Sequence, residues 1–135
     1  MTVLADFNII IPEDHQGIGV GRDEQSPVGP SFNTGGRLGE GDGQTGALAA
    51  FIMFSVLNLQ TRLDVFVNGE GPIGTMEPNP TPAWYSQVIC MSGGRLNGGD
   101  DLSNQISVGV PPESAVRSTT FEIKNLICFY HQDSD

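Results

Sequence analysis

The sequence predicts an all-β protein, an antiparallel two-sheet β-sandwich with jelly-roll topology. In residues 63–68, Leu63, Val65 and Val67 share one side of the chain, which is the two-residue period of a strand with one face in a core. The following pair, residues 68–69, is Asn-Gly and favours the positive backbone dihedrals of a tight hairpin turn. Roughly six to eight such segments, divided by Gly, Pro and Asn and without a helical period, favour strands at hairpin spacing.

The first predicted strand contains Phe7, Ile9 and Ile11 and ends at Pro12, because proline cannot donate to a strand ladder. Residues 13–45 carry almost no apolar periodicity and predict a long loop, of the kind that often binds a ligand. Within that loop, residues 17–21 are a candidate for a short edge strand.

The most apolar window, residues 47–59, predicts a central strand. Phe51 and Met53 occupy one side of it and Ile52 and Phe54 the other, so both sides are apolar. Its alanine-rich start leaves a helix as the alternative, and the window is too short to cross a bilayer.

Three further strands are expected over residues 85–91, 105–110 and 121–130. Ile106 and Val108 of the second are predicted to enter the core with the alternating residues of segment 63–68. We expect the whole chain, residues 1–135, to form one sandwich domain, since this length suits a single core.

The chain is acidic, with 16 Asp and Glu against 6 Lys and Arg and a formal net charge of −10. This balance disfavours nucleic acid and anionic membrane surfaces as partners, because both require clustered basic side chains. The start of the chain lacks a basic segment followed by an apolar one, so no classical signal peptide is expected. The sequence therefore indicates a soluble protein without membrane insertion and leaves its compartment open.

The two cysteines, Cys90 and Cys128, lie in apolar strand-like segments, where a thiol behaves as a small hydrophobe. We expect two buried free thiols, and a disulfide is the alternative if the two strands face each other.

No catalytic motif is present. His15 and His131 are the only histidines, and the chain has no paired-histidine zinc motif, no nucleophile elbow and no phosphate loop. We therefore expect a protein that is not an enzyme.

The order of motifs over about residues 50–130 resembles the second half of galactose-binding-like jelly-roll domains, a group that includes carbohydrate-binding modules and the sugar-binding domains attached to glycosidases. The matching residues are Val67-Asn68-Gly69, Ile73-Gly74, Trp84, Leu96 with Gly98 or Gly99, Asn104, Ile106, Val108 and the segment 121–130.

The resemblance implies a carbohydrate or glycan ligand. Trp84 and Tyr85 would form the stacking platform, since Trp84 follows a stiff proline-rich run. The alternative is that Trp84 starts a strand and packs over a core edge with Tyr85 exposed. The polar contacts would be Asn68, Asp14, His15 and Arg22, although charged loop residues are commonly just solvated.

Two glycine-rich acidic segments are weak candidates for a structural calcium site, because they place hard oxygen ligands close together. They contain Asp42 in one segment and Asp100 and Asp101 in the other. Acidic turns without metal are the alternative, and no other cofactor is expected.

Two functions follow from these observations. The first is a non-catalytic, lectin-like recognition module for carbohydrate. The second is a structural subunit of a virion, filament or other self-assembling particle, which suits the strand near Phe51 that is apolar on both sides. A homo-oligomer is expected under either hypothesis, because weak single sugar sites gain avidity by association.

Overall fold

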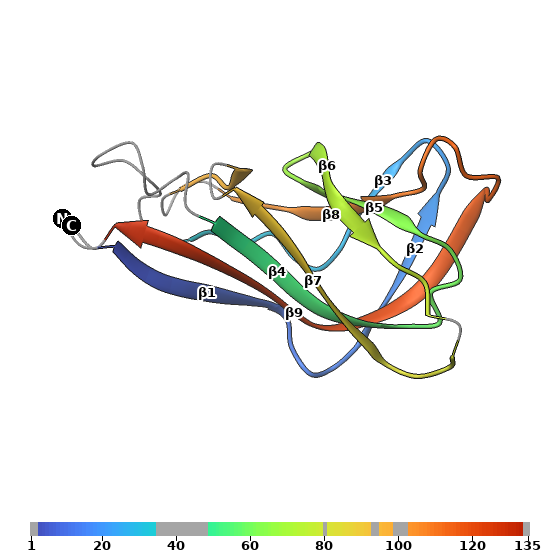
Figure 1. Cartoon of the computed structure of the whole chain (residues 1–135), viewed down its shortest axis with the longest axis horizontal. Coiled ribbons are helices and arrows are strands. Elements are labelled where there is room, and N and C mark those ends of the chain that lie inside the picture. Colours follow the sequence, from blue (N-terminus) through green and yellow to red (C-terminus); the bar gives the residue numbers. More distant parts are fainter. Residues whose placement is uncertain (1–2, 35–48, 80, 93–94, 99–102, 134–135) are drawn as a thin grey trace.

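The computed structural model describes residues 3–34, 49–79, 81–92, 95–98 and 103–133. These residues form nine strands and no α-helix (Figure 1). The strands are β1 (Val3–Ile11), β2 (Gln16–Gly21), β3 (Gln25–Pro27), β4 (Ala49–Leu57), β5 (Leu63–Val67), β6 (Glu70–Met76), β7 (Tyr85–Ser92), β8 (Ile106–Gly109) and β9 (Ser118–Asp133).

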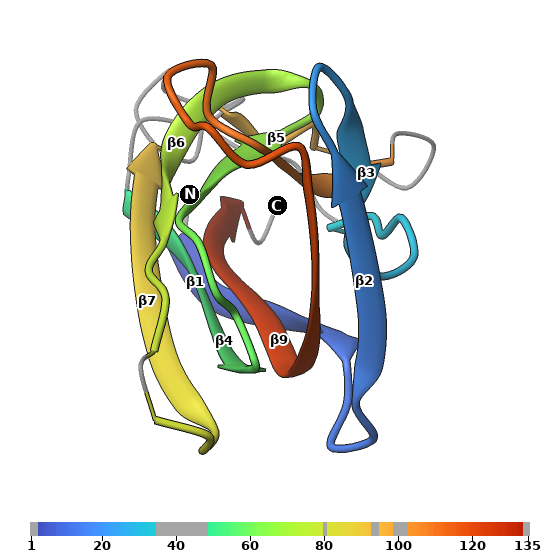
Figure 2. The same cartoon turned by 90° about the vertical axis from the view of Figure 1, so that its right-hand side faces the viewer.

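The strands build two antiparallel sheets that pack against each other (Figure 2). The larger sheet has the order β1-β9-β4-β7, with β2 also paired to β9, and the smaller sheet has the order β3-β8-β5-β6. The predicted all-β sandwich is therefore confirmed, and β4 is the predicted central strand, since it pairs with both β7 and β9. The jelly-roll topology stays a prediction.

Strand β9 pairs with three other strands of the larger sheet. One of its edges pairs with β4, and the other pairs first with β2 and then with β1. The change of partner occurs at Asn125, which has a positive φ of 54° and donates its backbone N–H to the carbonyl of Pro12. Register shifts in the β1 and β4 ladders lie beside it, as expected of β-bulges that bend a sheet.

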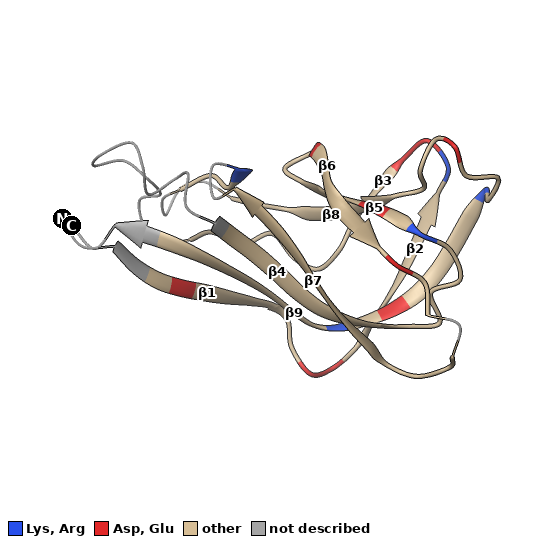
Figure 3. Cartoon of the chain, in the orientation of Figure 1, with Lys and Arg blue, Asp and Glu red and all other residues tan. Residues whose placement is uncertain are grey.

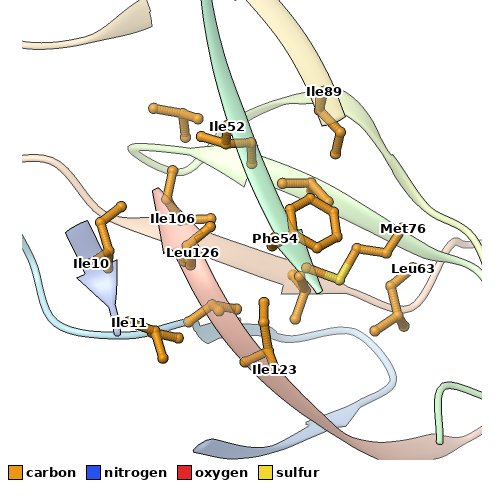
Figure 4. Packing of buried hydrophobic residues seen from close by; sticks show 14 of the residues in the cluster. Ile10, Ile11, Ile52, Phe54, Leu63, Met76, Ile89, Ile106, Ile123 and Leu126 are labelled. Atoms are coloured by element: carbon orange, nitrogen blue, oxygen red, sulfur yellow. The ribbon is translucent and has the colours of Figure 1, made fainter. Parts of the chain in front are cut away.

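The core lies between the sheets and is filled by aliphatic side chains with Phe54 and Met76 among them (Figure 4). The five side chains predicted to point inward are all fully buried, which confirms the predicted core-facing sides of β5 and β8. They are Leu63, Val65, Val67, Ile106 and Val108.

The β5–β6 hairpin turns at Asn68 and Gly69, as predicted, with φ values of 55° and 77°. Both residues therefore occupy the left-handed region that a two-residue hairpin turn of this type requires.

The described part of the predicted loop over residues 13–45 contains two strands: β2 confirms the candidate edge strand at residues 17–21, whereas β3 was not predicted. Strand β2 alternates glycine with Ile18 and Val20, and only those two side chains are buried against the core. Glycine is depleted in strands, so the pattern resembled a loop. The tertiary pairing of β2 with β9 outweighs that weak propensity.

The two cysteines are both free, but only Cys128 is buried. Burial raises the pKa of the Cys128 thiol to about 12. The expectation of a buried Cys90 is wrong, because β7 is an edge strand and Cys90 lies on its outer side.

None of the described residues forms a helix of the length and apolar character needed to cross a membrane.

Candidate functional site

The outer face of the larger sheet carries two complete rows of apolar side chains. Register pairs place these side chains side by side across four strands, in the strand order β1, β9, β4 and β7. The first row is Phe7, Phe129, Phe51 and Cys90, and the second row is Ile9, Ile127, Met53 and Val88. We call these eight side chains the apolar face.

The apolar face is open to solvent in the single chain. Phe7 is 53% exposed, and Ile9 and Val88 are each 57% exposed. These three residues belong to β1 and β7, the outer strands of the face, while the side chains on the two middle strands are half-buried by their neighbours. A contiguous exposed apolar patch of this kind marks an interaction site more often than chance exposure does.

The aromatic rings hold the first row in a defined arrangement. The Phe51 and Phe129 rings stack with their centroids 4.6 Å apart, and the Phe7 ring lies 5.9 Å from that of Phe129. Packed rings lose little further freedom when a partner covers them, so the face is preorganised for contact.

The smaller sheet has a polar outer face, which makes the apolar face of the larger sheet distinctive. Asp64 and Thr75 point outward there with Phe66 as the aromatic exception, and Ser107 donates its hydroxyl to Gln25 at 2.9 Å. An antiparallel sheet with one solvated side normally looks like this. The larger sheet departs from that rule.

A second group of side chains lies at one end of the same outer surface. The Lys124 ammonium sits 4.4 Å from the centre of the Trp84 ring, and the His15 ring lies 5.9 Å from it on centroids. His15 Nε2 also contacts Glu122 Oε1 at 3.0 Å. We call these four residues the Trp84 cluster; they come from β9, the β1–β2 loop and the residue that precedes β7.

The structure brings together Trp84 and His15 of the predicted sugar contacts, but it places Tyr85 elsewhere. Tyr85 has the strand parity of Ile89 and Met91, which point into the core, so it leaves β7 on the side opposite Val88. Tyr85 is 43% exposed. Trp84 is half-buried, immediately precedes β7 and has the Lys124 ammonium over its ring.

Asn68 belongs to a structural hydrogen-bond network between the β5–β6 turn and the segment before β8. Its side-chain amide donates to Asn104 Oδ1 at 2.9 Å and to the Arg95 carbonyl at 3.1 Å, and its Oδ1 accepts the Gln105 N–H at 2.9 Å. Asn104 is buried and also bridges to the backbone of Asn97. The polar atoms of Asn68 are thus already used within the fold.

The two remaining predicted polar contacts lie at opposite ends of β2. Asp14 is exposed in the β1–β2 loop beside His15, whereas Arg22 is exposed in the turn that follows β2. The length of β2 separates these positions by about 20 Å. Figure 1 shows the β1–β2 loop at the lower edge and the β2–β3 turn at the upper right.

The three calcium candidates, Asp42, Asp100 and Asp101, lie outside the described residues. Among the residues that are described, no three His, Cys, Asp or Glu side chains gather into a group that could hold a metal ion.

A hollow of about 500 Å³ lies on the outer side of the smaller sheet, between Asp23, Asp64, Phe66 and Pro112. Burial, and then the charge of Glu113, raise the pKa of the Asp64 carboxyl above its ordinary value, against a smaller opposing effect of Arg62. None of the predicted sugar contacts lines this hollow.

The sequence predicts one strand of the apolar face but not the face itself. The two-sided apolar pattern near Phe51 suits a self-assembling subunit, but it does not show which strands lie beside that strand. The same pattern recurs in β9, where Ile127 and Phe129 alternate with buried Cys128 and Tyr130. Two neighbouring strands with this property cannot both bury both sides in a sandwich of two sheets.

Compared with known proteins, the chain matches no family model, no curated protein and no solved structure.

Replacing Asn68 by glycine tests whether this residue stabilises the fold. Asn68→Gly keeps the positive φ accessible and removes three side-chain hydrogen bonds, so we expect the free energy of unfolding to fall by about 1–3 kcal/mol in urea titrations. Asn58→Gly is the matched control, because Asn58 also has a positive φ of 62° and is exposed. Its effect should stay within about 0.5 kcal/mol. Equal losses in the two variants would contradict the structural role of Asn68.

Proposed function

We propose that this chain is a non-catalytic structural subunit that assembles with copies of itself, and that the apolar face is the contact surface. The observation that carries the proposal is the pair of unbroken apolar rows across four strands, with Phe7, Ile9 and Val88 more than half exposed. Soluble monomers rarely leave such a continuous patch in water.

The energetics of the face favour a partner. Removing apolar surface from water contributes roughly 25 cal/mol per Å², so covering a half-exposed Ile or Phe contributes on the order of 1 kcal/mol. Most of the eight side chains are aliphatic or aromatic, and such residues dominate the buried centres of interfaces. Several such contributions on each of two partners offset the ordering of a few packed side chains and act against the roughly 4–15 kcal/mol cost of lost translational and rotational freedom.

Recognition of a carbohydrate is the second candidate, and the Trp84 cluster favours it. Trp84 keeps part of its surface in solvent, and the charged or hydrogen-bonding groups of His15, Glu122 and Lys124 surround it. This grouping of an aromatic ring with polar groups suits a pyranose ring and its hydroxyls. Lys124 already covers the ring, however, and Tyr85 leaves β7 on the other side, so the support is weaker than for assembly.

Placing one charge in the apolar face tests the assembly function. We expect Val88→Lys to raise the dissociation constant of the assembly at least about tenfold in analytical ultracentrifugation, because a symmetric contact buries the new charge twice. The fold should be unaffected, since Val88 is 57% exposed on an edge strand.

Thr75→Lys is the matched control for that experiment. Thr75 is also β-branched and also points outward from an edge strand, but it belongs to the smaller sheet. The dissociation constant of the Thr75→Lys assembly should match that of the unmodified chain. If the chain sediments as a monomer at every concentration up to about millimolar, the assembly function is wrong.

Glycan-array binding tests the second candidate. Under that hypothesis the unmodified chain binds a defined set of glycans, and Trp84→Ala abolishes the signal while the melting temperature stays within a few degrees. Tyr85→Ala should leave binding intact, because Tyr85 points away from the Trp84 cluster. An array without signal for the unmodified chain would rule out glycan recognition and leave the assembly function untouched.

A further inference from the structure

The exposed edges of the larger sheet are locally closed to an added strand. On β1, the Phe7 N–H donates to the neighbouring Asp6 carboxylate at 2.8 Å. On β7, the Gln87 side chain exchanges two hydrogen bonds with the backbone of Glu77, at 2.8 and 2.9 Å, so the segment after β6 covers this stretch. Charged groups and covering segments are devices that prevent edge pairing. The apolar face, in contrast, has no such cover among the described residues.

The face has the anatomy of a protein interface. Its two apolar rows are flanked by polar side chains, with Lys124 and the hydrogen-bonded Ser55–Ser86 pair at one end and His131 toward the other. Four strands about 4.8 Å apart, followed over about five outward positions, give an outer surface on the order of 600 Å². The eight side chains of the apolar face fill two of those five positions, and a standard interface buries about 800 Å² on each partner, so a second copy must cover the polar flanks as well as the apolar rows.

The distribution of charge affects whether two copies can bring their apolar faces together. None of the eight side chains of the apolar face is a carboxylate, although Figure 3 shows acidic residues on loops and within β1 and β9 as well. Contact between the two sets of apolar rows therefore creates no direct pairing of like charges. Each chain nevertheless carries a formal net charge of −10, so two copies repel each other over a distance that salt sets.

We infer that the occupant of the apolar face is a second copy of this chain, packed sheet against sheet, and that ionic strength controls this pairing. The inference rests on the proposed assembly function. Apolar contact supplies the attraction, and the repulsion between the acidic chains opposes it at low salt. Salt shortens the Debye length from about 14 Å at 0.05 M to about 4 Å at 0.5 M. It therefore screens most of the repulsion between the two acidic chains.

The sign of the salt effect separates this occupant from others. A basic partner protein would bind the acidic chain more weakly as salt rises, because its attraction is electrostatic. A second copy binds more tightly as salt rises. For two charges of this size, the screened Coulomb energy changes enough to tighten the dissociation constant at least about tenfold between 0.05 and 0.5 M sodium chloride.

Sedimentation velocity of the purified full chain over that range of sodium chloride is the test, with a charge variant as the second measurement. Glu70→Lys combined with Glu113→Lys changes two exposed carboxylates remote from the apolar face, and two reversals of +2 each bring the net charge from −10 to −6. Association of this variant should be tighter at 0.05 M, and its dependence on salt should be shallower. Val88→Lys should still weaken pairing at high salt.

The outcomes separate the inference from the proposed function. Association that weakens with salt, or that the charge variant leaves unchanged at 0.05 M, overturns the inference while the assembly function stands if Val88→Lys still disrupts it. Association that Val88→Lys does not affect overturns both. Salt-strengthened association that the charge variant relieves supports both.

Discussion

A sandwich of two sheets can cover only one side of each sheet, and this chain has strands that are apolar on both sides. In β4, Ile52 and Phe54 fill the core, while Phe51 and Met53 point the other way. Strand β9 repeats the pattern, with Cys128 and Tyr130 inside and Phe129 outside. The core, the register of the larger sheet and the apolar face all follow from this single constraint, because each inward residue fixes the direction of its neighbours.

The polar side chains that look available for ligands in the sequence are largely used by the fold. Asn68 and Asn104 join the β5–β6 turn to the approach of β8, where unpaired amides would be costly. Lys124 covers the ring of Trp84, and His15 meets Glu122. Among the described residues, the apolar face stays open to solvent, with Phe7, Ile9 and Val88 more than half exposed. For this reason the molecule offers a broad contact face more clearly than a small ligand site.

Strands with a regular apolar–polar alternation could be predicted from the sequence. Strands with little apolar pattern could not be predicted with the same certainty of position. The burial of Leu63 and Val65 and the turn at Asn68 follow from local rules alone, and the structure confirms them. Strand β2 was predicted only as a candidate within a loop, because its glycines carry little pattern and its pairing depends on the distant partner β9. Cys90 was placed inside because an apolar neighbourhood does not reveal which strand ends the sheet. The Trp84 cluster joins three segments that are far apart in the chain, so no local spacing of residues could have predicted it.

The most direct measurement is hydroxyl-radical footprinting of the intact chain by mass spectrometry, across concentrations below and above assembly. Met53 and Cys90 lie in the apolar face, Tyr85 lies on the opposite side of β7, and Met76 is fully buried. The assembly model predicts that oxidation of Met53 and Cys90 slows as concentration rises, while Tyr85 keeps its rate and Met76 stays protected. Oxidation of Met53 and Cys90 at one constant rate throughout, in samples that do assemble, would contradict the claim that the apolar face joins the subunits.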